Sequence, residues 1–445
     1  MVEDKTVLIV GSGAREHAIS LAYEKSSHVK RVIVTPGNDF ISYKRNKEVI
    51  VDKDSSVVDP KSILETAKRH EVDLVDVAND NSTYYGTVDL LAQKNFVVFG
   101  QTRQASRIEW DKAYSKEFMK KYYIPTSDFK SFNSKYDALR FLKQIYLESK
   151  EKLIFIKASG LCGGKGALSS TTLDQAVANL SDLDRFKYAA DTFLIEEGLT
   201  GEEFSYHIIT DGNTHHSFKA AQDNKRLINF DKGEQTGGMG GNSPCMIAKQ
   251  NKDSIEKNLV LKLTNALLLE KINYNGILYI GGIISKQQPF TIEYNARWGD
   301  PEAQIILPSL TIDYFELVSS CINKELDKFK ITMDDKVRLC VVGVLKGYPG
   351  DYSKNMGKQI YGLENILDSP DIDVFGAGIK VEDNKFYACS GRLFSIVAKA
   401  DNIVQARKKA YEAISEIRVQ GNNLHYRTDI ASRDVQRFHL SSKHF

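Results

Sequence analysis

Apolar and polar positions in the first hundred residues follow a repeating strand–helix rhythm. Apolar runs at 7–10, 29–34, 74–77 and 96–99 predict strands, and the stretches 14–23, 60–69 and 88–93 predict helices. Strands that alternate with helices indicate a parallel sheet covered by helices. The first strand is followed by Gly11-Ser12-Gly13, but Glu16 stands where the third glycine of a dinucleotide fingerprint belongs. This loop alone is equally compatible with a site for an anionic group and with a tight turn.

The rhythm stops near residue 100, and a glycine-rich segment follows. Residues 110–122 and 138–149 are predicted as helices, the first of which carries Lys112 and Lys116. The predicted strand 153–157 ends in Lys157 and leads into the loop 158–166, which has glycine at four of its last seven positions. Backbone N–H groups of such a loop can hold phosphates, although Lys165 lacks the following Ser or Thr of a P-loop. A mobile hairpin without a ligand is the alternative, and the lysine at the strand end favours nucleotide binding.

Two further strands and a polar stretch occupy residues 193–245. The predicted strands 193–199 and 202–209 are joined by a short link whose backbone groups could face an adenine edge, with Glu203 near a ribose. Acidic residues beside such a hairpin are more often simply solvated, so this pattern is a weak signal by itself. Residues 221–245 show no periodicity and are rich in polar residues and glycine, which favours a substrate-binding loop.

A predicted hairpin of strands 276–284 and 289–295 carries a candidate metal site. The second strand alternates apolar and polar residues, which places Glu293, Asn295 and Arg297 on one side. A carboxylate and an amide oxygen are ligands that Mg²⁺ accepts when nucleotide phosphates supply the others. Taken alone, this spacing is more typical of a solvated edge strand with a salt bridge. The apolar helix predicted at 254–269 is assigned to the core.

The last quarter of the chain changes character. Strands are predicted at 337–345, 372–375, 378–381 and 393–398, and a helix at 402–417. This pattern is typical of a small α+β domain that closes the chain.

Composition narrows the class of protein. The chain has 445 residues, enough for several domains, and 60 Lys plus Arg against 58 Asp plus Glu give a net charge of only +2. That balance gives no electrostatic argument for nucleic acid or an anionic membrane, and neither partner is expected. No apolar run approaches the ~18 residues of a membrane span, and the charged start of the chain is unlike a signal peptide. Five cysteines without a CxxC pair are expected to be reduced thiols in a cytoplasmic protein.

Motifs along nearly the whole chain resemble those of one family, the glycinamide ribonucleotide synthetases of the ATP-grasp superfamily. The segments that carry the resemblance are Gly11–His17, Ile156–Gly166, Glu196–Glu203, Gln222–Arg226, Thr236–Gly240, Glu293–Glu302, Gly347–Tyr352 and Ser390–Arg392. Thr236–Gly240 and Arg297–Glu302 are the most specific of these. The length favours the form without fused downstream enzymes.

The resemblance implies an α/β and α+β multidomain fold. It divides the chain into an N-terminal parallel α/β substrate-binding domain at 1–105, an ATP-grasp domain at 106–330 and a C-terminal α+β domain at 331–445. A mobile lid subdomain is implied at about 126–198. We expect a cytoplasmic monomer.

The resemblance also implies site residues. ATP would be held by Lys112, Lys157, Gly163, Gly164, Lys165, Gly166, Glu196, Leu199 and Glu203. Glu293 and Asn295 would hold Mg²⁺ or Mn²⁺. The acceptor substrate would face Gly11, Gly13, Asp80, Asp223, Arg297, Gly299, Asp300, Pro301 and Glu302, and the catalytic residues would be Arg297, Asp300, Lys225 and Asp223.

The implied chemistry is a two-step ligation. The glycine carboxylate attacks the γ-phosphate of ATP, and the amine of 5-phosphoribosylamine then captures the glycyl phosphate. Such a transfer needs positioning and charge neutralisation, which lysines, a metal ion and backbone donors supply, and a lid that excludes water protects the acyl phosphate.

Four positions depart from the family pattern. Ala14 stands for a glycine, Ser159 for an aspartate, Ala78-Asn79-Asp80 for Gly-Pro-Glu, and Gly376 lies near a usual histidine. The changed 78–80 loop lies at the end of a parallel strand, where ligands bind in such sheets. It motivates one alternative, an ATP-grasp ligase for a different acid or amine. A non-catalytic nucleotide-binding module is the second alternative.

Overall fold

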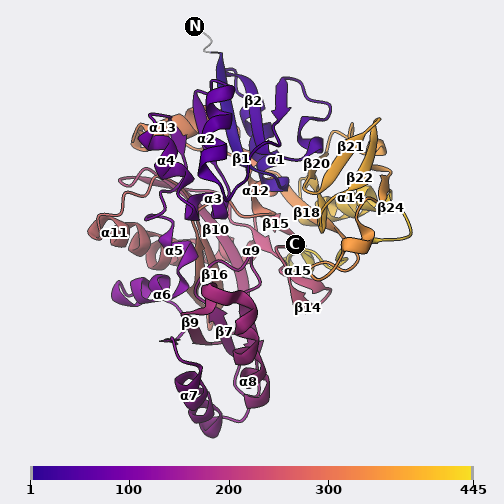
Figure 1. Ribbon diagram of the computed structural model, residues 1–445. Helices are drawn as coiled ribbons and strands as arrows, with labels where there is room; N and C mark the ends of the chain where they lie inside the picture. The colour runs from indigo at the N-terminus through magenta and orange to yellow at the C-terminus, as the bar shows by residue number, and fades with distance from the viewer. Residues whose placement is uncertain (1–3, 442–445) are drawn as a thin grey trace.

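The computed structural model describes residues 4–441, and it confirms the expected α/β and α+β multidomain architecture (Figure 1). The first hundred residues form a parallel sheet. The middle of the chain forms two antiparallel sheets, and the last third forms a longer antiparallel sheet with a smaller one beside it.

The N-terminal parallel sheet is covered by helices. Its elements are β1 (Lys5–Gly11), α1 (Ala14–Glu24), β2 (Val29–Pro36), η1 (Asp39–Ser42), β3 (Glu48–Val51), α2 (Pro60–Arg69), β4 (Leu74–Val77), α3 (Asp80–Tyr84), α4 (Thr87–Gln93) and β5 (Val98–Phe99). The strand order is β3-β2-β1-β4-β5. Val7 and Ile9 of β1 pack into one hydrophobic cluster, and Leu8 and Val10 pack into another, so both faces of the sheet are buried. The predicted strands and helices are confirmed, and β3 and α3 are additional short elements.

Residues 107–197 form helices and a four-stranded antiparallel sheet of order β6-β9-β7-β8. Its elements are α5 (Arg107–Trp110), α6 (Lys112–Lys121), β6 (Phe129–Phe132), α7 (Lys135–Glu148), β7 (Ile154–Ala158), β8 (Ala167–Ser170), α8 (Leu173–Asp182), η2 (Leu183–Ala190) and β9 (Phe193–Glu197). In Figure 1, α7 and α8 lie at the end of the molecule remote from the N-terminal sheet. The helix predicted at 110–122 is confirmed as α6, but it begins only at Lys112, because Asp111 ends α5 and its carboxylate caps α6 by accepting the Tyr114 N–H.

A second antiparallel sheet, of order β11-β10-β16-β17, contains the predicted hairpin. Its elements are β10 (Glu202–Thr210), β11 (His215–Ser217), α9 (Met246–Gln250), α10 (Lys252–Ile255), the π-helical turn η3 (Glu256–Val260), α11 (Leu261–Leu269), β16 (Gly276–Ser285) and β17 (Gln288–Asn295). Leu259 and Leu263 pack with Phe204 and Leu278, so the helices cover one face of the sheet. The predicted core helix at 254–269 is therefore confirmed as a continuous helical stretch with a π turn inside it.

The C-terminal part builds a long sheet of order β12-β15-β18-β23-β20, with β25 beside β18. Its elements, with the hairpin β13–β14, are β12 (Gln222–Asp223), β13 (Arg226–Ile228), β14 (Lys232–Gln235), β15 (Gly240–Ser243), β18 (Val337–Leu345), β20 (Ile372–Gly376), β23 (Arg392–Ala400) and β25 (Leu424–His425). The stretch 221–245 is thus not a loop without elements, as its missing periodicity predicted. Its strand β15 pairs with β18 and β12 pairs with β15, so the middle of the chain extends the C-terminal sheet.

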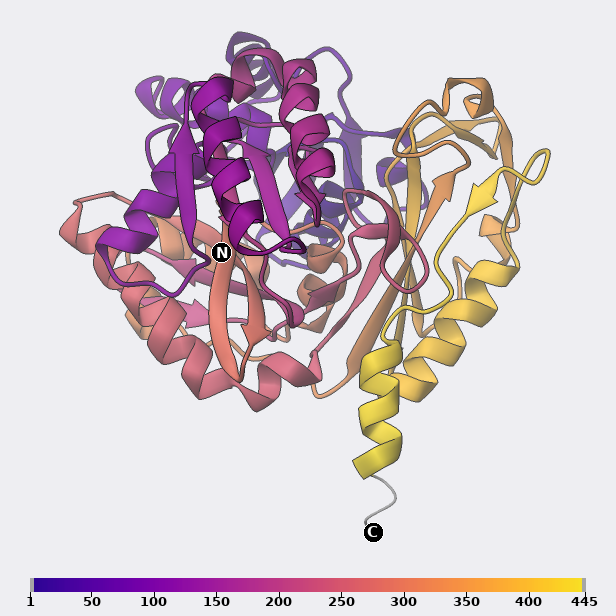
Figure 2. The same ribbon diagram turned by 90° about the horizontal axis from the view of Figure 1, so that it is seen from below.

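The remaining elements surround these sheets. They are α12 (Glu302–Ile306), η4 (Leu307–Ser309), α13 (Tyr314–Ile322), η5 (Leu326–Lys328), η6 (Ser353–Asn355), β19 (Gln359–Tyr361), η7 (Leu363–Asn365), β21 (Ile379–Glu382), β22 (Lys385–Ala388), α14 (Ile403–Ser415), β24 (Arg418–Val419) and α15 (Ser432–Ser441). In Figure 2 the helix α14 lies on the side of the C-terminal sheet that faces away from the purple and pink elements, and it packs on β18 and β23. The helix α15 instead contacts the middle of the chain, where Arg437 forms an ion pair with Glu202 of β10.

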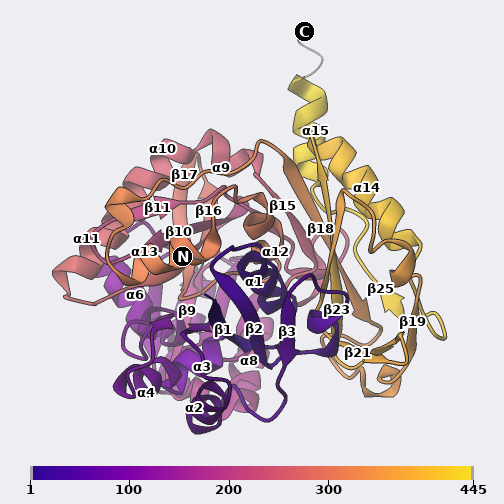
Figure 3. The ribbon, with the colours of Figure 1, turned by 90° about the horizontal axis from the view of Figure 1, so that it is seen from above.

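The three parts of the chain share a hydrophobic core. One cluster contains Val7 and Ile9 from the N-terminal sheet, Trp298 from the middle of the chain, and Val342 and Phe375 from the C-terminal sheet. Helix α1 contacts both α12 and β20, and Figure 3 shows α1 beside α12. This packing brings the loops after β1, β4 and β17 toward the same region.

Within residues 4–441, no helix combines the length and the apolar character needed to cross a membrane. The five cysteines, Cys162, Cys245, Cys321, Cys340 and Cys389, are free thiols.

Candidate active site

A cavity of about 390 Å³ opens where the N-terminal, middle and C-terminal parts meet. Polar and charged side chains from all three parts line it. A second cavity of about 440 Å³ shares Lys157, Glu196, Lys225 and Glu293 with the first, so the two form one connected cleft on either side of these residues.

Most of the sequence-predicted site residues line this cleft. The first cavity is lined by Gly13, Asp80, Lys112, Lys157, Gly163, Gly164, Gly166, Glu196, Asp223, Lys225, Glu293, Asn295, Arg297, Asp300 and Glu302, and the second adds Leu199 and Glu203. Four predicted residues, Gly11, Lys165, Gly299 and Pro301, line neither cavity. Lys165 instead extends from the glycine loop to the C-terminal part, where its Nζ donates a hydrogen bond to the Pro349 carbonyl oxygen at 2.9 Å.

The glycine turn after β1 is closed by a carboxylate of its own helix. Glu16 Oε2 accepts the Gly13 N–H at 2.7 Å. Gly11 has φ +143°, and a Cβ there would come within 2.5 Å of the Glu16 side chain, so the turn requires glycine. Arg15 Nε binds the second oxygen of the same carboxylate at 2.7 Å. The Glu16 carboxylate, paired with Arg15, therefore lies on the cavity wall. The Gly13 N–H already donates its hydrogen bond to this carboxylate.

Two buried lysines converge on one glutamate at the boundary between the cavities. Lys116 Nζ and Lys157 Nζ each lie 2.9 Å from Glu196 Oε2. Burial lowers the pKa of Lys116 to about 8, although Glu196 opposes this effect. Burial would raise the pKa of Glu196, but Lys157 and Lys116 outweigh it and hold that pKa below its ordinary value. Lys116 was noticed in the sequence but given no role, and its position one turn after Lys112 was the signal that both face the same way.

Glu293 lies at the centre of the cleft and carries its charge at neutral pH. Its Oε1 accepts a hydrogen bond from Lys225 Nζ at 3.2 Å. Burial would raise its pKa, but Lys225, Lys157 and Lys112 outweigh burial and lower the pKa to about 2. An ionised carboxylate beside lysines that can hold phosphates is suited to bind a divalent cation together with those phosphates.

Asn295 and Arg297 are positioned beside Glu293. Arg297 Nη2 donates to Asn295 Oδ1 at 3.2 Å and lies 3.0 Å from Glu109 Oε1. Glu109 Oε2 also accepts the Ala296 N–H at 2.8 Å. The amide oxygen of Asn295 keeps a second lone pair, so the donor set of one carboxylate and one amide oxygen fits a hard cation such as Mg²⁺. Glu109 was missed from the sequence, because only the folded chain places it opposite Arg297.

The C-terminal sheet supplies an arginine that the sequence analysis gave no role. Arg392 Nη2 lies 2.6 Å from Asp300 Oδ2, and its Nη1 donates to the carbonyl oxygens of Gly237 at 2.8 Å and Asp300 at 3.2 Å. The Tyr348 hydroxyl accepts the Gly237 N–H at 3.0 Å. The signal was the sequence Ser390-Gly391-Arg392, which belonged to the matched motifs. This arginine connects the turn after β17 to the Thr236–Gly240 loop.

Asp223 faces the same side of the cleft with an altered acidity. Burial and the nearby carboxylate of Glu302 raise its pKa well above the ordinary value, and Lys225 and Arg392 only partly oppose this effect. Its Oδ1 is buried without a hydrogen-bond partner among the described residues. A carboxyl group of this kind takes up a proton more readily than an ordinary aspartate.

The positions that depart from the family pattern have local explanations. Asn79 caps α3 by accepting the N–H groups of Asn81 and Ser82, and it leaves Asp80 on the cavity wall. Ser159 Oγ accepts the Ala113 N–H and donates to Asp111, each at 2.9 Å. A Cβ on Gly376 would meet the Phe40 ring at 2.7 Å. Asn79, Ser159 and Gly376 thus each have a local structural role, and Asp80 still lines the cavity.

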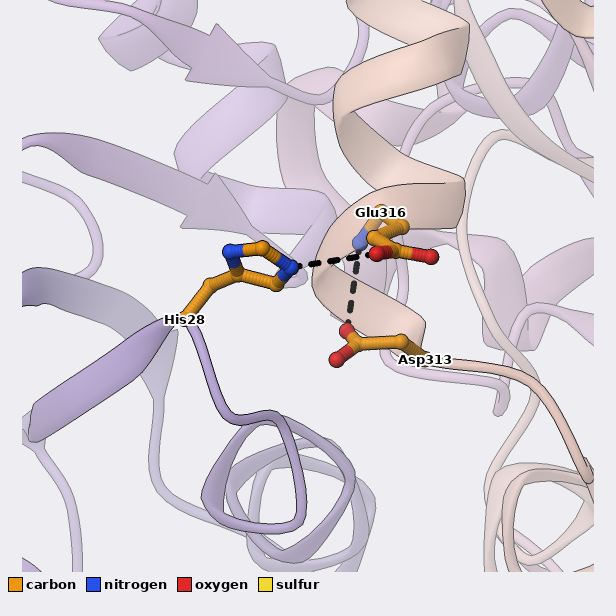
Figure 4. A group of neighbouring side chains, drawn as sticks. All are labelled: His28, Asp313 and Glu316. Carbon is orange, nitrogen blue, oxygen red and sulfur yellow. Dashed lines mark hydrogen bonds and ion pairs between the residues drawn. The ribbon is translucent and has the colours of Figure 1, made fainter. Parts of the chain in front are cut away.

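Another group with metal-like spacing lies outside the cleft. His28, Asp313 and Glu316 each have a potential ligand atom within 4.8 Å of the others (Figure 4). His28 Nε2 already lies 3.0 Å from Glu316 Oε1, and Asp313 Oδ1 caps α13 by accepting the Glu316 N–H. Because these atoms already have partners, we interpret the group as a structural contact between α13 and the loop before β2.

Comparisons with known proteins agree with this geometry. Three family models match the chain in succession: the phosphoribosylglycinamide synthetase N domain at residues 5–109, its ATP-grasp (A) domain at 110–303 and its C domain at 338–433. The phosphoribosylamine–glycine ligase of Fusobacterium nucleatum is 35% identical, and the alignment covers 96% of this chain and 98% of that protein.

Solved structures show the same fold. The crystal structure of phosphoribosylamine–glycine ligase from Thermotoga maritima superposes with a TM-score of 0.79 at 28% identity, over 96% of this chain and all of that one. The biotin carboxylase domain of 2-oxoglutarate carboxylase from Hydrogenobacter thermophilus, solved with magnesium ADP and bicarbonate, gives a TM-score of 0.69 over 96% of this chain and 97% of that chain. At 14% identity, this second likeness concerns the fold alone.

Proposed function

The chain belongs to the phosphoribosylglycinamide synthetase family, and we propose from this membership that it uses ATP to join glycine to 5-phosphoribosylamine. The products are glycinamide ribonucleotide, ADP and phosphate, a step of de novo purine synthesis. The observation that carries the proposal is the single cavity whose lining includes Lys116, Lys157, Glu293, Asp300 and Arg392.

The proposed domain division remains 1–105, 106–330 and 331–445, with a lid at about 126–198. The sheet β6-β9-β7-β8 gives the lid its own hydrophobic cluster, which supports motion as a unit. The strands β12 and β15 belong to the C-terminal sheet, although they precede residue 331. We therefore treat the Asp223–Ser243 segment as the connection through which the ATP-grasp and C-terminal domains act together.

ATP is proposed to lie along the connected cavities. Leu199 and Glu203 would receive the adenosine in the second cavity, which Phe155, Ile283 and Ile292 also line. The phosphates would lie toward the first cavity, where Lys112, Lys157 and the Gly163–Gly166 loop contact them. Lys116 joins this set, because it shares Glu196 with Lys157. Cationic side chains and loop N–H groups neutralise the charge that moves during phosphoryl transfer.

Glu293 and Asn295 are proposed to hold Mg²⁺ or Mn²⁺. When bound, such an ion neutralises phosphate charge and aligns the phosphoryl group with its acceptor. Glu293 is ready for this role because Lys225, Lys157 and Lys112 keep it ionised. Arg297 orients Asn295 through the hydrogen bond to its amide oxygen.

The acceptor side of the cleft is proposed to complete the reaction. Arg297, fixed by Glu109, lies where it can bind the glycine carboxylate as it attacks the γ-phosphate. The amine then attacks the carbonyl carbon of glycyl phosphate, the C–O bond to phosphate breaks, and the amine loses a proton. Asp223 can take that proton, because burial and Glu302 raise its pKa well above the ordinary value. Asp80, Asp300 and Glu302 offer acceptors for the hydroxyl groups of a ribose.

A coupled assay of ADP release across amine and acid pairs tests this proposal. With the purified full-length chain, we expect ADP release to require both glycine and 5-phosphoribosylamine, with one glycinamide ribonucleotide formed per ADP. Alanine in place of glycine, and ammonia in place of the amine, serve as matched substitutes. Release of ADP without any amine, or faster turnover with another acid, would contradict the proposed substrates while leaving the family assignment intact.

A further inference from the structure

The turn that carries Arg297, Asp300 and Glu302 rests on one face of β10. Ser205 and His207 of β10 point toward this turn, because alternate residues of a strand share a face. His207 pairs in register with Tyr279 of β16. Both β10 side chains are buried, with Ser205 2% and His207 0% exposed.

His207 holds the backbone of the turn. Its Nε2 accepts the Gly299 N–H at 3.2 Å. The ring is stacked between Tyr279, at 4.4 Å between centroids, and Trp298, at 5.4 Å. Burial, with a smaller effect of Arg297, lowers the pKa of His207 to about 3, so the imidazole is neutral and Nε2 is free to accept.

Ser205 holds the other end of the turn. Its hydroxyl donates to Glu302 Oε1 at 2.7 Å and lies 3.0 Å from the Tyr279 hydroxyl. A Cβ on Gly299 would come within 2.3 Å of Glu302 Oε2, so the carboxylate lies directly over the backbone that His207 holds. Asp300 and Glu302 both line the first cavity, and His207 does not.

Keeping a histidine at this buried position has a cost. With Nε2 accepting, the proton is on Nδ1, and that atom has no hydrogen-bond partner among the described residues. A buried donor without a partner destabilises the fold, because it has lost its hydrogen bond to water. A phenylalanine would fill the space between Tyr279 and Trp298 without this cost, so packing alone does not explain the imidazole.

We propose that His207 is a positioning residue of the acceptor site, which fixes the Gly299 N–H and thereby sets where Asp300 and Glu302 lie in the cavity. The inference rests on the proposed function, because the acceptor amine is the ligand that these two carboxylates face. ATP lies against other residues, so its binding does not depend on His207.

Two substitutions at this position separate the roles of the ring. His207→Phe keeps the stacking and removes the acceptor, whereas His207→Gln removes the ring and keeps an acceptor at similar reach. We expect His207→Phe to raise the KM of the acceptor amine about tenfold, with the KM of ATP unchanged. His207→Gln should recover most of that loss. Ser205→Ala, which frees Glu302, should raise the same KM.

His216→Phe on the neighbouring strand is the matched control, because its Nε2 also binds a backbone atom, the Leu326 carbonyl at 2.7 Å, away from the turn. It should leave the KM of the amine unchanged. If wild-type protein shows no ligation, the proposed function fails. If wild type is active and His207→Phe has the wild-type KM for the amine, or loses ATP and amine affinity equally, the positioning role fails.

Discussion

At the scale of single residues, Glu293 illustrates how the cleft holds a charge in a partly buried place. Lys225 Nζ lies 3.2 Å away, and with Lys157 and Lys112 it lowers the pKa of the carboxyl group to about 2, against the opposing effect of burial. Because this folded pKa lies below the ordinary value of 4.5, the ionised form stabilises the fold above pH 4.5. That contribution is lost as the pH falls from 4.5 through 2, so a metal site here is fully charged at neutral pH.

Replacement of this carboxylate tests the proposed metal role. Glu293→Gln keeps the shape of the side chain but removes the charge that a divalent cation requires. We expect turnover to fall roughly 100-fold or more and the Mg²⁺ concentration for half-maximal activity to rise. The measurement is ADP release during a Mg²⁺ titration. Glu270→Gln, at a surface glutamate paired with Lys121, is the control and should behave as wild type. An unchanged Mg²⁺ requirement in Glu293→Gln would exclude the metal role.

Lys116 predicts how the enzyme responds to alkaline pH. Burial lowers its pKa to about 8 from the usual 10.5, so the folded protein loses this proton before the unfolded chain does. The contribution of Lys116 to stability therefore improves between pH 8 and 10.5, while its charge in the nucleotide cavity disappears. We expect kcat/KM for ATP to fall above pH 8, since this ratio reports groups of the free enzyme.

The variant Lys116→Met separates this residue from other titrating groups. It should lower kcat/KM for ATP at pH 7 about tenfold and abolish the decline between pH 7 and 9. Lys120→Met, at an exposed position one turn later on α6, should keep the wild-type profile. A wild-type decline that persists in Lys116→Met would assign it to another group.

Lys112, Lys157 and Glu293 could be proposed as site residues because each stands at a strand or helix end within a motif. Glu109 could not, since its partner Arg297 lies far away in the sequence and meets it only after folding. Arg392 stands in a matched motif, but its partner Asp300 is likewise revealed only by the folded chain. Local pattern reports which side chains point outward, and it carries no information on which distant charge they will face.

At the scale of elements, local sequence pattern again predicts some features, whereas others depend on partners that meet only in the folded chain. The strand β1, the helix α2 and the β16–β17 hairpin were predictable because their residues form either apolar runs of strand length or a regular alternation of apolar and polar positions. The strands β12 and β15 were not, because they are two and four residues long and rich in glycine and polar residues. The strand β15 forms because β18 provides a partner edge, and β12 forms in turn beside β15, which is a tertiary effect.

The contact between Lys165 of the glycine loop and the C-terminal part is expected to control how well ADP release is coupled to ligation. Lys165 Nζ donates to the Pro349 carbonyl oxygen at 2.9 Å and so ties the loop after β7 to the C-terminal part. Lys165→Met should loosen this closure and let water reach the acyl phosphate. We expect more than one ADP per ligated product, a severalfold excess when amine is limiting, measured by quantifying both products. Lys143→Met, exposed on α7, should retain one-to-one coupling. A one-to-one ratio in Lys165→Met would show that this contact does not control water access.

At the scale of the whole molecule, the acceptor side of the cleft depends on the C-terminal sheet. One hydrophobic cluster joins the N-terminal sheet, the turn at Trp298 and the C-terminal sheet, so these parts are packed as one body around the cavity. The nucleotide side, by contrast, is built from residues 112–295 with contributions from the loop at 427–433. A substitution in the C-terminal sheet at the cavity is therefore expected to weaken the binding of the amine more than the binding of ATP.

Arg392 allows that expectation to be tested at one side chain. Its guanidinium binds the Asp300 carboxylate at 2.6 Å and the carbonyl oxygens of Gly237 and Asp300 at 2.8 and 3.2 Å, and a lysine cannot reproduce this fork. Arg392→Lys keeps the charge, so it should lower kcat/KM for the amine by about 10- to 100-fold while the KM of ATP stays within twofold. Arg31→Lys is the control, because Arg31 also binds a backbone carbonyl oxygen, that of His70 at 2.8 Å, and lines neither cavity. Equal losses for ATP and amine in Arg392→Lys, with a lower melting temperature, would mean that Arg392 only stabilises the fold. A loss confined to the amine would instead establish that the C-terminal sheet forms part of the acceptor site.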